Sequence, residues 1–214
     1  MANRYQAVLL FGAPGVGKGT QGKILAQIPG FYHFSTGDMF RNLDLSAGIG
    51  KEIMAYMSKG ELVPDQLTIK LWRENTHARS VLGFYKPHHD ILILDGMPRN
   101  VKQAEMLEDD INVLAVVHLV CRDKDEMVRR LQRRALKENR QDDAQADVIR
   151  RRLHVYEQET APVLAHYPSD LIYEVDALGS PAYVLQHILE VLVPVQDAHF
   201  NNPITGGEPV STGT

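Results

Sequence analysis

A glycine-rich segment near the N-terminus carries the residue types that bind phosphate. Residues 12–20 read GAPGVGKGT and follow a short apolar run at 7–11. Glycines let backbone N–H groups approach a ligand closely, and here those groups would lie at the positive end of the next helix. Lys18 adds a mobile positive charge for the outer phosphates of a nucleotide. The segment therefore predicts a site for a nucleoside triphosphate.

The position of the hydroxyl departs from the general pattern G-x-x-x-x-G-K-[ST]. Gly12 to Lys18 match it, but Gly19 follows and the hydroxyl comes one residue later, at Thr20. A glycine-rich turn without a ligand is the alternative interpretation. The order of apolar strand, loop, lysine and helix favours the nucleotide site.

A second group of candidate residues follows the apolar run 90–94. Asp95 ends this run in the manner of the strand-borne carboxylate that orients magnesium beside a phosphate-binding loop. An aspartate that merely caps a turn is the alternative. Gly96, Arg99 and Gln103 come next and supply further polar groups for a ligand.

Length and composition limit the class of protein. A chain of 214 residues suits one α/β domain with insertions, and 23% charged residues with a net charge of −4 indicate neither disorder nor general affinity for nucleic acid. Cys121 is the only cysteine, so no internal disulfide and no cysteine-rich zinc site can form. No run approaches the roughly 20 apolar residues of a membrane span, and no signal peptide is evident. We expect a cytoplasmic monomer without nucleic-acid or membrane partners.

The elements alternate along the chain between strands and helices. Strands are predicted at 7–11, 32–35, 90–94, 113–121 and 171–175, and helices at 20–28, 38–45, 51–59, 64–80, 123–137, 144–166 and 180–193. Such alternation predicts an α/β fold in three layers, with a central five-stranded parallel sheet covered by helices on both faces. Ligands of such sheets bind beyond the carboxyl ends of the strands, where the candidate residues fall.

Several motifs in a fixed order give the sequence a family resemblance. They are GAPGVGKGTQ (12–21), STGDMFR (35–41), GELVPD (60–65), LDGMPRN (94–100), RLQRR (130–134), RQDD (140–143) and RRRLHVYEQETAPVL (150–164). In these stretches the chain resembles the adenylate kinase family of nucleoside monophosphate (NMP) kinases, in its short-lid form, over residues 5–193. The resemblance implies a P-loop NTPase fold and a single kinase domain, 1–195. Its core would comprise 1–35, 65–133 and 144–195, with a helical NMP-binding insertion at 36–64, a short lid at 134–143 and a polar, disordered tail at 196–214.

The resemblance also implies an activity, the reversible transfer of the γ-phosphoryl group of MgATP to AMP to give two ADP. The residue types suit this reaction, because the acceptor is already a phosphate anion and needs no general base. Catalysis then consists of holding two polyanions in line and neutralising their charge, which lysine and arginine do well.

Site residues follow from the resemblance, position by position. The ATP site would comprise Gly15, Val16, Gly17, Lys18, Gly19, Thr20, Arg130, Arg134 and Gly179. The AMP site would comprise Thr36, Arg41, Leu62, Val63, Gly96, Arg99, Gln103, Arg140 and Arg152. The catalytic cations would be Lys18, Arg41, Arg99, Arg134, Arg140 and Arg152. Magnesium would bind through waters near Asp95 and Thr20, with Asp38 a less secure candidate, and the short lid leaves no room for a zinc site.

One of these assignments depends on the phase of a helix. Between Arg140 and Leu153 the chain is one residue longer than the family pattern, so the last clamping arginine is Arg151 by one count and Arg152 by the other. The apolar face formed by Ile149, Leu153 and Tyr156 fixes the helix phase better than a loop does, which favours Arg152.

Three other functions compete with this interpretation. A UMP/CMP kinase shares the loop and the short lid, and Asn100 favours it, whereas Gln103 and Thr36 favour AMP because glutamine can pair with an adenine edge. A GTP-dependent switch would need an Asn-Lys-x-Asp motif, which the sequence lacks. A nucleotide-binding module without turnover would be expected to have lost Lys18 or an arginine.

Overall fold

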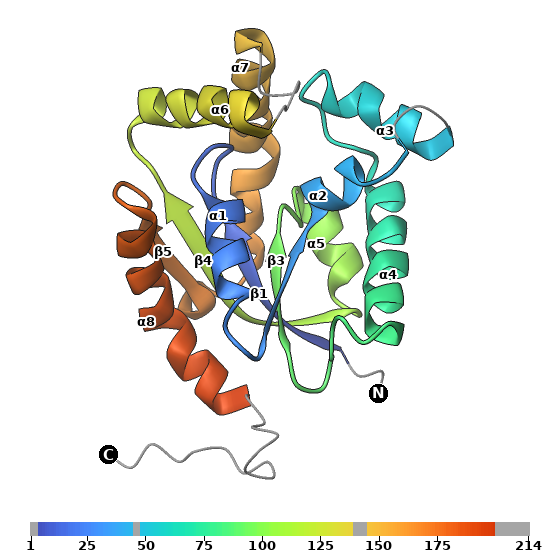
Figure 1. The fold of residues 1–214 in the computed structure, drawn as a ribbon, viewed down its shortest axis with the longest axis vertical. Coiled ribbons are helices and arrows are strands. Elements are labelled where there is room, and N and C mark those ends of the chain that lie inside the picture. The colour runs from blue at the N-terminus through green and yellow to red at the C-terminus, as the bar shows by residue number, and fades with distance from the viewer. Residues whose placement is uncertain (1–3, 45–47, 139–144, 200–214) are drawn as a thin grey trace.

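A computed structural model of the protein describes residues 4–44, 48–138 and 145–199 and contains one sheet of five strands. Its strands are β1 (Tyr5–Phe11), β2 (Phe31–Ser35), β3 (Ile91–Asp95), β4 (Ile111–Val120) and β5 (Ile172–Asp176). They are parallel and lie in the order β2-β3-β1-β4-β5, with β1 at the centre (Figure 1). This order brings the carboxyl end of β1 beside that of β3, where Leu10 pairs with Asp95.

Alternate residues of the strands build two separate hydrophobic cores. Leu9 and Leu94 point to one face, and Leu10 and Ile93 point to the other. Because strand side chains alternate, a strand buried on both faces must be apolar throughout, as the sequence of β3 is up to its terminal Asp95. All five residues of β3 are buried, which explains why the apolar runs were reliable signals of the sheet.

Helices cover both faces of the sheet. The core containing Leu10 packs against α1 (Lys18–Leu25) and α8 (Pro181–His199). The core containing Leu9 packs against α2 (Thr36–Arg41), α3 (Gly48–Met57), α4 (Asp65–Val81) and α5 (Val101–Leu107). Helices α3, α6 (Lys124–Glu138) and α7 (Ala146–Val155) stand beyond the same edge of the sheet (Figure 1). None of the helices within the described ranges has the length and apolar character to cross a membrane.

The predicted α/β fold in three layers is confirmed, but one helix was missed and another ends later than predicted. Helix α5 was not predicted; Asn100 begins it by accepting a hydrogen bond from the backbone N–H of Gln103 at 2.8 Å. Helix α8 continues to His199, so residues 196–199 belong to it and not to a tail, and residues 200–214 lie outside the described residues. The predicted lid, 134–143, is described only to Glu138, and that part continues α6.

The single long helix predicted at 144–166 was also wrong. Helix α7 ends at Val155, a π-helix follows over Tyr156–Thr160, and a 3₁₀-helix covers Ala161–His166. Pro162 accounts for the break, because proline has no N–H to donate to the carbonyl four residues earlier and its ring clashes with that carbonyl. The apolar periodicity continues through the break and therefore concealed it.

The double burial of β3 gives a test of the fold. We expect Ile93→Ala to lower the free energy of unfolding by about 2–5 kcal/mol, because it leaves a cavity in a closed core. Val81→Ala is the control, since this side chain is 71% exposed and its loss should cost less than about 0.5 kcal/mol. Urea denaturation measures both, and equal losses would contradict the assigned core.

Candidate functional site

The glycine-rich loop connects the end of β1 to the start of α1. Gly12, Gly15 and Gly17 all have positive φ angles, and a Cβ at Gly12 would overlap the carbonyl oxygen of Leu119. The backbone path therefore requires glycine at this position. No side chain caps the N-terminus of α1, which leaves its first N–H groups directed at whatever the loop encloses.

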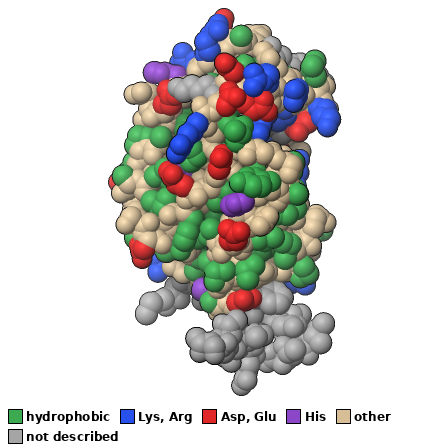
Figure 2. Space-filling model, turned by 90° about the vertical axis from the view of Figure 1, so that its left-hand side faces the viewer, with side chains coloured by type: hydrophobic (Ala, Val, Ile, Leu, Met, Phe, Trp, Pro, Cys, Tyr) green, Lys and Arg blue, Asp and Glu red, His purple; other side chains and the backbone are tan. Residues whose placement is uncertain are grey.

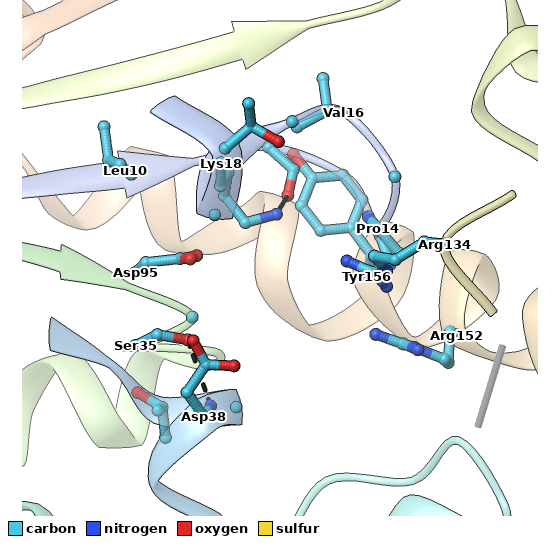
Figure 3. Close-up of a pocket in the computed structure, with 18 of the residues that line it drawn as sticks. Leu10, Pro14, Val16, Lys18, Ser35, Asp38, Asp95, Arg134, Arg152 and Tyr156 are labelled. Atoms are coloured by element: carbon cyan, nitrogen blue, oxygen red, sulfur yellow. Dashed lines mark hydrogen bonds between the residues drawn. The ribbon is translucent and has the colours of Figure 1, made fainter. Parts of the chain in front are cut away.

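A cavity of about 800 Å³ extends from this loop across the carboxyl edge of the sheet. Residues from α1, α2, α4, α6, α7 and the loops after β1, β3 and β5 line it. Figure 3 shows Arg134, Arg152 and Tyr156 on one side of it and Asp38 and Asp95 on the other. Chain segments distant in sequence thus contribute charged groups to one space.

Lys18 lies at the centre of this arrangement (Figure 3). Its ammonium donates to the carbonyl oxygens of Gly12 at 2.6 Å and Ala13 at 3.1 Å. Burial lowers the pKa of Lys18 to about 8; Asp95 opposes this effect, whereas the positive charges of Arg99, Arg134 and Arg152 add to it. The lysine is therefore poised to gain from any anion that enters the cavity.

Acidic groups occupy the side of the cavity near β2 and β3. Asp95 is buried, and its Oδ2 would lie 3.5 Å from a Cβ at Gly19, so the carboxylate faces the loop. His33 approaches the same oxygen at 3.5 Å through Nε2. Asp38 instead pairs with Arg41, whose Nη2 donates to its Oδ1 at 2.5 Å.

The predicted arginines that are described all line the cavity, but their contacts differ. Arg99 donates through Nε to the carbonyl of Gly96 at 2.7 Å. Arg130 donates to Glu126 and, at 3.0 Å, to the carbonyl of Ala177, so it braces α6 against the loop after β5. Arg134 and Arg152 direct their guanidinium groups toward the region of Lys18 (Figure 3).

One part of the same cavity, the second compartment, is lined by residues of α2 and α5 and of the loops after α3 and β3. These residues are Thr36, Leu62, Val63, Gly96 and Gln103, all of which the family resemblance assigned to the AMP site. The hydroxyl of Thr36 is buried and has no hydrogen-bond partner among the described residues. Gln103 is held from both ends, because its Oε1 accepts from the N–H of Arg99 at 2.8 Å and its Nε2 donates to Asp65 at 2.9 Å. Each end of the amide still has one hydrogen-bonding position to offer.

The turn before α8 closes the cavity near α1. Gly179 has a φ of +146° and packs against the ring of Tyr183. Gln21 was not predicted as a site residue, yet it is buried, lines the cavity and donates to the carbonyl of Pro181 at 3.0 Å. Gln21 belongs to the GKGTQ motif and lies one turn into α1, and this position could have indicated that it faces the site.

The two neighbouring arginines of α7 point in different directions. Arg152 lines the cavity, and its Cγ would lie 2.9 Å from a Cβ at Gly60. Arg151 is more exposed and pairs with Glu61 at 2.9 Å. Arg140, the predicted lid arginine, lies outside the described residues.

Tyr156 is a further cavity residue that the sequence analysis treated only as part of an apolar face. It begins the π-helix that follows α7, four residues after Arg152, and both side chains line the cavity. Burial raises the pKa of Tyr156 to about 12. Basic side chains also gather at this end of the molecule on the surface, around α6 and α7 (Figure 2).

Comparisons with known proteins agree with this site. Residues 10–172 match the model of the family described as adenylate kinase. The chain belongs to the adenylate kinase family. Adenylate kinases from Thermobifida fusca and Thermus thermophilus are each 39% identical to it, over 86% and 87% of this chain and 97% of theirs. That of Synechococcus sp. strain CC9902 is 40% identical over 90% of this chain and all of its own. The predicted family is confirmed, and with it the class of nucleoside monophosphate kinases.

The lowered pKa of Lys18 leads to a prediction about pH. The lysine is charged below pH 8 and becomes neutral above it, whereas a bound polyphosphate favours the charged form. Triphosphate affinity should therefore fall as pH rises through 8, by up to about tenfold per pH unit, with a proton taken up on binding. Calorimetry at pH 9 in buffers of different ionisation enthalpy measures this uptake. Constant affinity from pH 7 to 9.5, without proton exchange, would contradict it.

Proposed function

We propose that the protein transfers the γ-phosphoryl group of ATP to AMP, and that the residues lining the cavity bind both nucleotides and stabilise the transferring group. One observation carries the proposal: Lys18 and the arginines of four other segments line a single cavity, which is large enough to receive phosphates from two nucleotides. A catalyst that joins two polyanions needs such a concentration of positive charge.

The donor nucleotide fits the compartment beside the glycine-rich loop. The backbone N–H groups of residues 15–20 would hold the phosphates of ATP, and Lys18 would reach the outer ones. Arg130 shapes this compartment by bracing α6, and the turn at Gly179 offers backbone groups to the adenine. Arg134 would contact the phosphates from α6.

The acceptor fits the second compartment. Arg41 and Arg99 would bind the phosphate of AMP, Leu62 and Val63 would contact the base, and the buried hydroxyl of Thr36 offers a further hydrogen bond. Gln103 can present one acceptor and one donor to an adenine edge, and its fixed orientation makes that pairing selective. Asn100 does not favour a pyrimidine, because its side chain caps α5 and donates to Asp65.

Transfer itself requires alignment and charge neutralisation. Lys18, Arg134 and Arg152 face one part of the cavity (Figure 3), and they would surround the migrating phosphoryl group. Arg140 of the lid is proposed to complete the set. Closure of the segments 36–64 and 134–143 over the substrates would exclude water and so prevent hydrolysis of ATP.

The chain also fits magnesium bound to the nucleotide. Within the described ranges no cluster of three or more His, Cys, Asp or Glu side chains could enclose a metal ion. Magnesium is commonly held by one carboxylate, substrate phosphates and waters, and the buried carboxylate of Asp95 faces the loop for this purpose. Thr20, which lines the cavity, is the second candidate. The ion would neutralise charge on the phosphates during transfer.

A phosphoryl-transfer assay tests the acceptor. With MgATP as the donor, we expect ADP formation to be fastest with AMP, and slower with CMP, UMP and GMP, because a mismatched polar edge beside Gln103 costs on the order of 1–3 kcal/mol. Fastest transfer to CMP or UMP would favour a UMP/CMP kinase. No transfer to any acceptor would overturn the proposed function.

Neighbouring substitutions on α7 test the choice of arginine. Arg152→Ala should reduce kcat/KM by about 100-fold or more, because it removes a cation from the transferring group. Arg151→Ala should reduce it by less than about fivefold, because its exposed ion pair with Glu61 is worth about 1 kcal/mol or less. Steady-state kinetics measures both. A larger loss for Arg151→Ala would reverse the assignment.

A further inference from the structure

The π-helix Tyr156–Thr160 directly follows α7, the helix that carries Arg152 into the cavity. An uninterrupted α-helix would leave Arg152 and Thr160 about 80° apart around its axis, because each residue turns by about 100°. The π-helix holds more residues per turn and reduces this offset. Arg152, Tyr156 and Thr160 accordingly all line the cavity, and Val155 lines it beside them.

Both ends of the π-helix are tied to the core. Its first residue, Tyr156, places its hydroxyl 3.2 Å from Nε2 of His118, which lies on β4. Its last residue, Thr160, donates through its hydroxyl to the carbonyl oxygen of Arg99 at 2.8 Å. Two hydrogen bonds therefore fix the turn against the sheet and against the loop that carries an acceptor-site arginine.

The His118 end of this anchor lies beside a carboxylate. Nδ1 of His118 lies 3.6 Å from the carboxylate of Glu174, its neighbour in register on β5. Burial lowers the pKa of His118, although Glu174 opposes this effect, so the imidazole is neutral at pH 7. A neutral imidazole has one donor and one acceptor; Glu174 favours the N–H on Nδ1, which leaves Nε2 to accept from the hydroxyl of Tyr156.

We propose that His118 and Tyr156 are positioning residues for phosphoryl transfer, which hold the π-helix in the phase that directs Arg152 rather than Arg151 into the cavity. This inference rests on the proposed function. Without the hydroxyl–imidazole bond, the turn could revert toward α-helical phase and rotate Arg152 away from the migrating group. A displacement of about 1 Å at such a group is enough to cost up to about 100-fold in rate.

Four variants test the anchor. Tyr156→Phe and His118→Leu should each lower kcat about tenfold, with the KM for ATP changed less than about threefold. The double variant should be no slower than either single variant, because both remove the same bond. His118→Gln should recover most of kcat, because an amide oxygen can accept from the hydroxyl. Tyr167→Phe is the matched control: this buried hydroxyl has no hydrogen-bond partner among the described residues, so kcat should not change.

Hydrogen exchange gives a second measurement that does not depend on turnover. Amides of residues 152–160 should exchange faster in Tyr156→Phe than in Tyr167→Phe. Equal kcat values for these two variants, or losses that multiply in the double variant, would overturn the positioning role even if exchange quickens. Absence of transfer in the wild-type protein would instead overturn the proposed function, and the exchange experiment would still test the anchor.

Discussion

Positive charges gather at one edge of the sheet and repel one another, so the structure around them must offset that repulsion. Lys18, Arg99, Arg134 and Arg152 lie close enough that the three arginines lower the pKa of the lysine. Like charges inside a partly buried space destabilise a fold unless other groups compensate. The carbonyl oxygens of Gly12 and Ala13 and the carboxylate of Asp95 provide that compensation for Lys18. A polyanionic substrate compensates the charges more fully.

The parallel sheet makes this concentration of charge possible. Parallel strands end at a common edge, so the loop after β1 and the carboxylate at the end of β3 become neighbours without any special contact. Helices α6 and α7 stand beyond this edge and contribute further arginines to the cavity. Hydrogen bonds then hold these helices in place. Arg130 ties α6 to the carbonyl of Ala177, and the hydroxyl of Thr160 ties the π-helix after α7 to the carbonyl of Arg99.

The apolar pattern of the sequence predicted most helices and strands correctly. It missed helix α5 and the break after Val155. The central strands β1 and β3 were correct because burial on both faces demands apolar runs, which few other structures require. Helix α5 was missed because it is short and its cap, Asn100, lies inside a motif that was interpreted for its chemistry. The break after Val155 was missed because apolar spacing tolerates a single wide turn, and Pro162 was treated as part of a motif.

The phosphate-binding loop, the family and the types of residue in the site can all be inferred from the amino-acid sequence. These follow from local rules: glycine at positive φ, lysine after the loop, and arginine for phosphate. How those residues meet depends on the folded chain. It tied Gln103 to Arg99 and Asp65, used Asn100 as a cap, and turned Arg152 toward the cavity and Arg151 toward Glu61. The physical reason is that side-chain direction depends on helix phase and on partners distant in sequence, such as His118, which no local pattern encodes.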